Sequence, residues 1–257
     1  MSFDVAAEAY DRFMGRYSAE LAPPLVDFAG VGGAHKVLDV GCGPGALTAE
    51  LVRRFGQDSV AAVDPSERFV SAACARYPGV DVRHSPAEDL PFADGVFDAT
   101  LAQLVVHFMS DPSAGLKEMA RVTRAGGVVA ACVWDSAGER SPTSAFWHAA
   151  RELDATLEDE SGLAGSREGQ LAELFRRAGL ASVDEGALSV AFHHASFDEW
   201  WEPFTLGVGP AGAYARTLRE GDLTMVRERC RELLPEGPFT LTAFAWAARG
   251  VTRGDER

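Results

Sequence analysis

The chain has 257 residues, 47% of them hydrophobic, and its formal net charge is −14. This length suits one large α/β domain or such a domain with an appended cap, and the hydrophobic content is sufficient for a sizeable core. The acidic balance argues against a nucleic-acid partner, because phosphate binding requires clustered Lys and Arg, and it argues against binding to an anionic membrane surface.

Three further features of the sequence predict a cytoplasmic protein that does not span a membrane. The N-terminal stretch MSFDVAAEAYDRF carries charge early and lacks the apolar core of a signal peptide. The strongly apolar stretch 125–134 has about half of the roughly 20 residues that a membrane span needs. The cysteines show no CxxC pair and no metal-ligand spacing with His, so we expect reduced thiols and no metal site at Cys42, Cys74, Cys132 and Cys230.

Short apolar runs alternate with helical patterns from residue 36 to residue 134. Ser66 is a typical N-cap, and Asp111 followed by Pro112 is another, so two of the helices are expected to begin there. Near-continuous apolar strands separated by helices indicate a parallel, doubly wound sheet. The expected strands are 36–40, 59–64, 80–84, 96–104 and 126–134, and the expected helices are 46–55, 66–77 and 111–124.

The alternation changes after residue 134, where helical patterns follow one another before two further strands. We expect these strands to extend the sheet and the helices to cap its open edge. The chain is therefore predicted to form one domain, 1–257, with lid helices within 136–235. The expected helices lie in 143–160, 166–180, 197–204 and 222–234, and the expected strands in 180–192 and 238–248.

The stretch VLDVGCGPGALTAEL, residues 37–51, places three glycines between an apolar strand and a helix. In a doubly wound sheet, ligands bind at the carboxyl ends of the strands, and a glycine-rich loop lets the backbone and its N–H groups approach them. Residues 41–46 fit the GxGxxA pattern, and Asp64, 18 residues after Ala46, is a candidate ribose ligand. As a bare pattern this fits NAD about as well as other adenosine ligands.

The wider context separates these ligands. The segments LDVGCGPG, VDPS, SPAEDLPFADGVFD and EMARVTRAGG occur in order within residues 37–134. Their order and spacing resemble those of class I S-adenosylmethionine-dependent methyltransferases. The N-terminal AYDRFMGRYS resembles a leader helix of small-molecule members related to the ubiquinone and menaquinone methyltransferases, so leader helices are expected within 1–30.

The resemblance implies a fold and a cofactor. The fold is a Rossmann-like, doubly wound seven-stranded sheet, mostly parallel with the last strand antiparallel, and it carries a helical lid. The alternating strand FTLTAFAWAA stands where the antiparallel strand is expected. The cofactor is S-adenosyl-L-methionine.

Roles for individual residues also follow from the resemblance. Asp39 would orient the glycine loop or reach the amino group of the cofactor, and Asp64 would accept both ribose hydroxyls. Pro86 stands where the family often has Asp, so Glu88 is the candidate for the adenine contact. The implied cofactor-binding residues are Arg16, Tyr17, Asp39, Gly41, Cys42, Gly43, Asp64, Pro65, Ala87, Glu88, Gln103 and Leu104.

Several of these residues also have structural interpretations. Asp64 can cap the helix that follows it, and Glu88 can be a solvated loop charge. Arg16 and Tyr17 can be ordinary surface residues. His107, just after the fourth strand, is either a packed core histidine or a catalytic base near the methyl group.

Aromatic residues in the predicted lid form the candidate acceptor pocket. Trp147, Trp200, Trp201 and Phe204 would line an apolar pocket with a few polar groups, and the alternative is that they form the core of the lid. The acidic chain disfavours a polyanionic acceptor. We therefore expect an apolar or aromatic small molecule as the acceptor.

The predicted function is transfer of a methyl group from S-adenosylmethionine to this small-molecule acceptor by in-line displacement. One alternative is a cofactor-binding protein of the same fold with other or no catalytic chemistry. A second is an NAD-dependent oxidoreductase, which is disfavoured because the chain has no Tyr-x-x-x-Lys pair for proton relay. The acceptor's identity, the methylated atom and the oligomeric state do not follow from the sequence.

Overall fold

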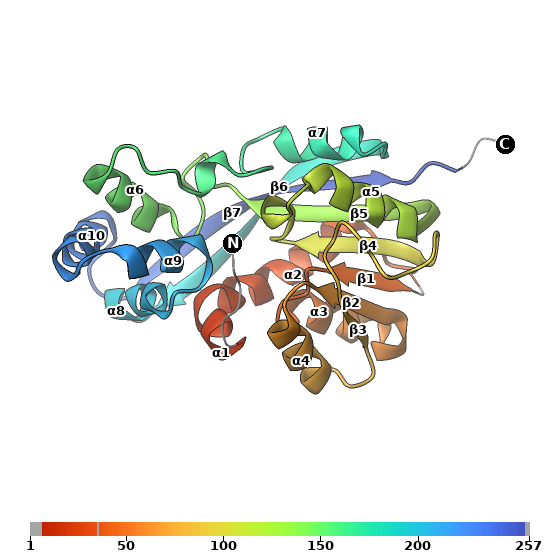
Figure 1. Ribbon diagram of the computed structural model, residues 1–257, viewed down its shortest axis with the longest axis horizontal. Helices are drawn as coiled ribbons and strands as arrows, with labels where there is room; N and C mark the ends of the chain where they lie inside the picture. Colours follow the sequence, from red (N-terminus) through yellow and green to blue (C-terminus); the bar gives the residue numbers. More distant parts are fainter. Residues whose placement is uncertain (1–6, 35, 255–257) are drawn as a thin grey trace.

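The structure is a computed structural model, and it describes residues 7–34 and 36–254. Seven strands form one sheet in the order β3-β2-β1-β4-β5-β7-β6 (Figure 1). The strand β7 runs antiparallel to both of its neighbours, and the other pairings are parallel. The predicted fold is thereby confirmed. The strands are β1 (Val37–Val40), β2 (Val60–Asp64), β3 (Asp81–His84), β4 (Phe97–Gln103), β5 (Thr123–Trp134), β6 (Ala181–His194) and β7 (Phe239–Val251).

Helices alternate with the strands and then follow one another. The α-helices are α1 (Ala7–Tyr10), α2 (Arg16–Ala29), α3 (Ala46–Phe55), α4 (Glu67–Arg76), α5 (Pro112–Val122), α6 (Ser144–Leu153), α7 (Gln170–Arg177), α8 (Phe197–Trp201), α9 (Gly209–Thr217) and α10 (Glu220–Leu233). Shorter turns are the π-helix η1 (Asp11–Gly15) and the 3-10 helices η2 (Gln57–Ser59), η3 (Val106–Phe108), η4 (Glu160–Gly162) and η5 (Glu202–Leu206). Within the described part of the chain, every helix is too short or too polar to cross a bilayer.

Local sequence accounts for the first half of the fold. Helix α3 has the bounds predicted for it, 46–55. Ser66 caps α4 and Asp111 caps α5, each by accepting hydrogen bonds from backbone N–H groups in the first turn. The strands β1 and β2 are buried along their whole length, which is why their sequences read as continuous apolar runs.

Two hydrophobic layers hold the sheet. One layer joins α2 and α3 to the sheet, and Leu21, Leu25, Leu47 and Leu51 lie within it, each at most 2% exposed. The other joins α5 and α7 to the opposite face. Helix α7 falls inside the range predicted to contain the lid, but it packs on the sheet beside α5 (Figure 1).

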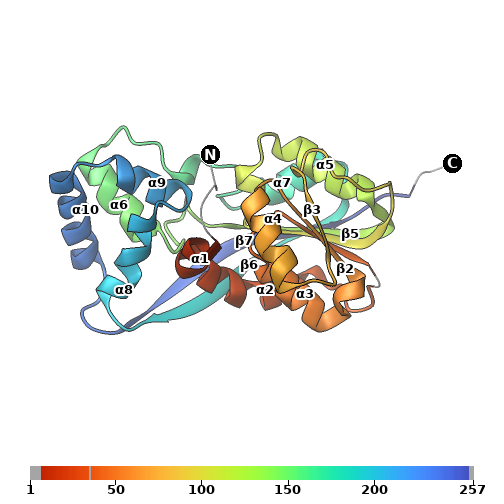
Figure 2. The same cartoon turned by 60° about the horizontal axis from the view of Figure 1, so that its bottom comes forward.

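The lid consists of α6, α8, α9 and α10 and stands beyond the end of the main sheet, where β6 and β7 extend toward it (Figure 2). Its core is an aromatic cluster in which side chains from α6, α8 and η5 pack on one another. We define the aromatic cluster as Phe146, Trp147, Trp200, Trp201 and Phe204, all at most 6% exposed.

The lid differs from its prediction in two places. The helix expected over 143–160 ends at Leu153, because the Asp154 side chain accepts hydrogen bonds from both the N–H and the hydroxyl of Thr156 and forms a turn. Helix α9 was not predicted. Its sequence GPAGAYART contains two glycines, and Gly212 packs against the Gly207 backbone, where a Cβ would meet it at 2.8 Å.

The leader is helical from residue 7 to residue 29, and residues 1–6 of the predicted range 1–30 lie outside the described residues. Helix α2 packs along the sheet against α3 and β6. The first turns, α1 and η1, lie between the lid and α4 (Figure 2). The leader therefore contacts both the sheet and the lid.

Candidate functional site

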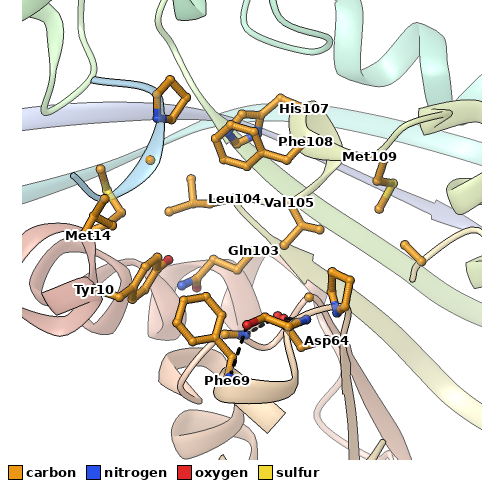
Figure 3. A pocket seen from close by; sticks show the side chains of 18 of the residues that line it. Tyr10, Met14, Asp64, Phe69, Gln103, Leu104, Val105, His107, Phe108 and Met109 are labelled. Carbon is orange, nitrogen blue, oxygen red and sulfur yellow. Dashed lines mark hydrogen bonds between the residues drawn. The ribbon is translucent and has the colours of Figure 1, made fainter. Parts of the chain in front are cut away.

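A cavity of about 780 Å³ lies between the carboxyl ends of the parallel strands and the lid. Its volume falls in the range of roughly 300–1,000 Å³ typical of small-molecule sites. Figure 3 shows Gln103 and Leu104 between Asp64 on one side and His107 on the other. Nine predicted residues line the cavity: Gly41, Gly43, Asp64, Pro65, Ala87, Glu88, Gln103, Leu104 and His107. We call the part lined by the glycine loop, Asp64 and Gln103 the strand-end half, and the part lined by Thr143, Glu160 and residues 208–211 the lid half.

The glycine loop is held by hydrogen bonds within the protein. The N–H groups of Gly41 and Cys42 both donate to the Val63 carbonyl, at 2.8 and 2.9 Å. Gly43 N–H donates to Asp64 Oδ2 at 2.8 Å. The expectation that these N–H groups serve a ligand is therefore wrong for all three. Gly41 and Gly43 nevertheless line the cavity.

Position 41 requires glycine because of its backbone conformation and because of a neighbouring side chain. Its φ is +71°, and a Cβ at this position would lie 2.4 Å from the Val105 side chain. A side chain would therefore be strained by the backbone and would collide with the loop that follows β4. Gly41 and Val105 both line the cavity.

Asp64 ends β2 and is 5% exposed. Its Oδ2 accepts from Gly43 N–H and its Oδ1 from Ser66 N–H, each at 2.8 Å. Burial raises the pKa of this carboxyl. A carboxylate has about four acceptor positions, so Asp64 can fix the two loops and still accept ligand hydroxyls. The capping and ligand interpretations of this residue are compatible.

Asp39, near the end of β1, and Cys42, within the glycine loop, are absent from the cavity lining, contrary to their prediction as cofactor-binding residues. Asp39 Oδ2 accepts from Thr48 Oγ1–H at 2.6 Å, which ties the end of β1 to α3. Burial raises the pKa of Asp39 to about 7. Of the two roles considered for Asp39, orientation of the loop matches this position. The Cys42 thiol is buried and contacts the Gly43 carbonyl.

Arg16 and Tyr17 do not line the cavity, contrary to their prediction as cofactor-binding residues. The Tyr17 hydroxyl shares a 2.8 Å hydrogen bond with His194 Nε2 on β6, and Arg16 pairs with Glu199 of the lid at 3.3 Å. Because the π-helical turn η1 directly precedes them, these residues do not lie where continuous α-helical spacing would place them, and Tyr17 contacts β6 instead. The leader residues that do line the cavity are Tyr10, Phe13 and Met14.

The aromatic cluster does not line the cavity either, so its assignment to the acceptor pocket is corrected. Phe146 stacks on Phe204 with ring centroids 4.8 Å apart, and Trp200 contacts Phe204 at the same distance. Trp201 packs parallel to Phe197. These rings pack against one another and not against the cavity. They therefore form the core of the lid, which was the alternative interpretation.

The lid half contains polar residues that the sequence did not identify as candidate site residues. Glu160 is 9% exposed, and its Oε2 accepts from Trp147 Nε1–H at 2.6 Å and from Thr143 Oγ1–H at 3.1 Å. Burial raises the pKa of Glu160. In the sequence this residue lies in the acidic run EDE, which is typical of a solvated surface, so no local signal identifies it.

His107 lies on η3 at the edge of the cavity and is 8% exposed. Burial lowers its pKa to about 3, because the imidazolium would be desolvated. Its Nδ1 has no hydrogen-bond partner among the described residues. The side chain is therefore a neutral imidazole at physiological pH, suited to hydrogen bonding more than to proton abstraction.

Two observations test whether an adenosylmethionine group fits this site. Gln103 donates through Nε2 to the Ser18 carbonyl at 2.9 Å, and its buried Oε1 has no partner among the described residues. The buried acceptor oxygen suits the cationic end of S-adenosylmethionine. The glycines of the loop have no Cβ and so leave room for a ligand beside the backbone. The residues present therefore fit the group.

In residues 7–34 and 36–254, no group of three or more His, Cys, Asp or Glu side chains is placed to hold a metal ion.

Known proteins of similar sequence are methyltransferases. A profile of the methyltransferase domain family matches residues 38–131. An uncharacterized methyltransferase of Mycobacterium bovis is 36% identical over 140 residues, which are 54% of this chain and 54% of that protein. The chain thus matches about half the length of this relative. A Mycolicibacterium smegmatis protein named as an S-adenosylmethionine-dependent methyltransferase is 33% identical over 205 residues, 75% of this chain and 76% of that protein.

Two solved structures of similar fold are named as methyltransferases. A Bacillus halodurans protein named as a methyltransferase aligns with a TM-score of 0.60 at 16% identity, over 91% of this chain and 99% of that chain. Geranyl diphosphate C-methyltransferase from Streptomyces coelicolor, solved with S-adenosyl-L-homocysteine, aligns with a TM-score of 0.54 at 18% identity, over 92% and 80% of the two chains. At these identities the likeness concerns the fold.

Proposed function

We propose that this chain, which belongs to the class I S-adenosylmethionine-dependent methyltransferases, transfers a methyl group to a small-molecule acceptor held in the lid half of the cavity. The observation that carries the proposal is the continuity of the cavity. One space joins the glycine loop and Asp64 to a buried, mostly apolar wall formed by the leader and the lid. A cofactor site and an acceptor site would therefore open onto each other.

The strand-end half would hold the cofactor, as the family resemblance implies. When bound, S-adenosylmethionine supplies a methyl group already activated on a sulfonium. Asp64 would accept the ribose hydroxyls while it keeps its two internal hydrogen bonds. Gln103 would offer Oε1 to the cationic end of the cofactor. Ala87 and Glu88 also line the cavity and would flank the adenine.

The remaining task of the protein is to position the acceptor and exclude water. Positioning two reactants in a near-attack geometry lowers a barrier by about 7–11 kcal/mol. Phe13, Met14, Phe108 and Trp134 give the cavity an apolar lining. His107 would provide a neutral hydrogen-bonding group there, because its low pKa makes it a weak base.

The relatives differ in the acceptor that their names state. One relative, from Dechloromonas aromatica, is a malonyl-[acyl-carrier protein] O-methyltransferase, 29% identical over 94% of this chain. Another, from Mycolicibacterium vanbaalenii, is a demethylmenaquinone methyltransferase, 45% identical over 38% of this chain. The proposal therefore specifies a small molecule without adopting either acceptor. We also propose a cytoplasmic location, consistent with free thiols at Cys42, Cys74, Cys132 and Cys230.

Calorimetric titration with S-adenosylhomocysteine tests the cofactor site. We expect a dissociation constant in the micromolar range, about −8 kcal/mol, and no binding of NADH. Asp64→Ala removes charge-assisted hydrogen bonds and should weaken binding by about 2–3 kcal/mol. Asp81→Ala, on an exposed residue of β3, is the control and should leave affinity unchanged. Binding of NADH but not of S-adenosylhomocysteine would contradict the proposal.

A further inference from the structure

The lid half contains a carboxyl group whose orientation is fixed by the protein. Glu160 stands at the start of η4 and lines the cavity although it is only 9% exposed. The Trp147 indole and the Thr143 hydroxyl both donate to Oε2, at 2.6 and 3.1 Å. Neither of them bonds Oε1. Two donors on one oxygen hold the carboxyl rigidly and leave the other oxygen for a partner in the cavity.

The residues around Glu160 do not neutralise it. The preceding residue, Asp159, forms an ion pair with Arg151, so this arginine is paired with Asp159 and not with Glu160. The lid-half residues that line the cavity beside Glu160 are Thr143 and residues 208–211, Val-Gly-Pro-Ala, none of which carries a charge. A carboxyl group in such surroundings is costly unless a hydrogen-bond donor reaches it.

Other residues that line the same cavity are apolar. Phe13 and Met14 come from the leader, and Trp134 comes from the end of β5. Trp134 Nε1–H is directed at Met14 Sδ, at 3.3 Å, and so is not aimed at the cavity centre as a donor. A ligand that fills this space needs an apolar body, and Glu160 offers a hydrogen-bond acceptor to a polar group on that body.

We infer that Glu160 is a specificity residue that binds an N–H or O–H donor of the methyl acceptor, so the acceptor is an apolar amine or alcohol and not a free carboxylate. The inference rests on the proposed function, because it assumes that the cofactor fills the strand-end half. A carboxylate would face ionised Glu160 as a like charge, and it has no proton to donate to the free Glu160 oxygen. An ammonium or a hydroxyl would instead complete the set of donors around the Glu160 carboxyl.

Three compounds with one skeleton test this inference by calorimetric titration: 2-phenylethylamine, 2-phenylethanol and 3-phenylpropionate. Each is titrated at pH 7 into protein saturated with S-adenosylhomocysteine, so that Asp64 is covered. We expect the amine and the alcohol to bind at least tenfold more tightly than the carboxylate. The alcohol separates hydrogen bonding from a general attraction of cations to an acidic protein. The indole series tryptamine, tryptophol and indole-3-propionate repeats the comparison with a larger apolar body.

Two variants locate the preference. Glu160→Gln keeps the shape of the side chain and an acceptor oxygen for Trp147, and it should reduce the preference for donors over carboxylates to less than threefold. Glu158→Gln removes the same charge from an exposed residue two positions away and should retain the wild-type preference. The melting temperature of each variant, measured alongside, verifies that the lid is folded.

The outcomes are distinct from those of the cofactor test. Failure of S-adenosylhomocysteine to bind would reject the proposed function. If it binds, three results each overturn the inference about Glu160: carboxylates that bind as tightly as the amines and alcohols, donors that fail to bind in both series, or a Glu160→Gln variant with an unchanged preference. Recovery of carboxylate binding in Glu160→Gln would support the inference most directly.

Discussion

The two halves of the cavity are built in different ways. The strand-end half contains a loop held by its own backbone, in which Gly41, Cys42 and Gly43 donate their N–H groups to Val63 and Asp64. The lid half is made of side chains carried by separate elements, and Glu160 is held there by donors from the region of α6. A loop fixed by its own backbone depends little on individual side chains, so it suits a ligand that all members of a family share. A site made of side chains can be altered by substitution as the acceptor changes.

The leader joins the two halves. Tyr10 packs edge-on against Phe69 of α4 with ring centroids 5.3 Å apart, and Phe13 packs against Phe204 of the lid at 5.1 Å. One helical segment thus contacts α4 with one residue and the lid core with another. Because the halves share this segment, variants must separate effects on folding from effects on binding.

The largest effect is expected in the lid core. Trp201→Ala should lower the free energy of unfolding by about 3–5 kcal/mol, because it removes a large buried ring from the aromatic cluster. Thermal or urea denaturation measures this loss, and Trp201→Phe should recover much of it. At a temperature where the variant is folded, affinity for S-adenosylhomocysteine should change less than threefold. A variant with the wild-type melting temperature would show that this ring does not stabilise the lid.

The same contrast explains which parts of the site could be predicted from the sequence. The strand ends were predictable because short segments determine them: the glycine loop follows β1, and Asp64 ends β2. A strand, a tight turn and a capped helix are local structures. Nine predicted residues accordingly line the cavity, although their binding roles stay predictions.

The lid side could not be predicted in the same way. Tyr17 follows a π-helical turn that sequence spacing does not reveal, and it turns toward His194. Trp200 and Trp201 are residue types common in ligand pockets. The sequence does not reveal that the packing of the lid places these two rings against one another. Glu160 resembles a surface charge until the tertiary fold brings Trp147 to it.

The second prediction concerns the buried carboxyl of Asp39, near the end of β1. In the unfolded chain Asp39 ionises near pH 4, whereas in the folded protein its pKa is raised to about 7. The folded state therefore binds more protons than the unfolded state between these values, and wild-type stability falls as pH rises through this window. Asp39→Asn removes the ionisation. Its stability relative to wild type should increase from pH 4 to pH 7, by up to about 4 kcal/mol, and then stay constant.

Thermal denaturation of the cofactor-free protein at pH 5 and pH 8 measures this difference. Asp58→Asn is the matched control, because it removes the same charge from an exposed residue and should change stability little at either pH. An Asp39→Asn variant that is equally destabilised at both values would indicate that Asp39 is ionised in the fold and that its bond to Thr48 dominates.

The third prediction addresses the backbone of the strand-end half. Gly41→Ala places a Cβ at positive φ and 2.4 Å from the Val105 side chain, so the loop must shift. We expect about a 100-fold loss of S-adenosylhomocysteine affinity, roughly 2.7 kcal/mol. Gly32→Ala is the control, since no atom lies within 4 Å of the added Cβ. The double variant Gly41→Ala, Val105→Ala should recover part of the affinity. If Gly41→Ala binds as wild type does, the loop does not approach the cofactor.

The smallest expected effect distinguishes the two sides of the leader. Tyr17→Phe removes one hydrogen bond, to His194 Nε2, and keeps the ring that packs against Phe192. Because His194 is then left without that partner, the free energy of unfolding should fall by about 1 kcal/mol. Affinity for S-adenosylhomocysteine should stay within twofold, since Tyr17 does not line the cavity. Tyr10→Ala, on the side of the leader that lines the cavity and contacts Phe69, should weaken the same affinity clearly. A tenfold loss of affinity in Tyr17→Phe would instead restore the role that the sequence predicted for this residue, and it would mean that the leader moves when the cofactor binds.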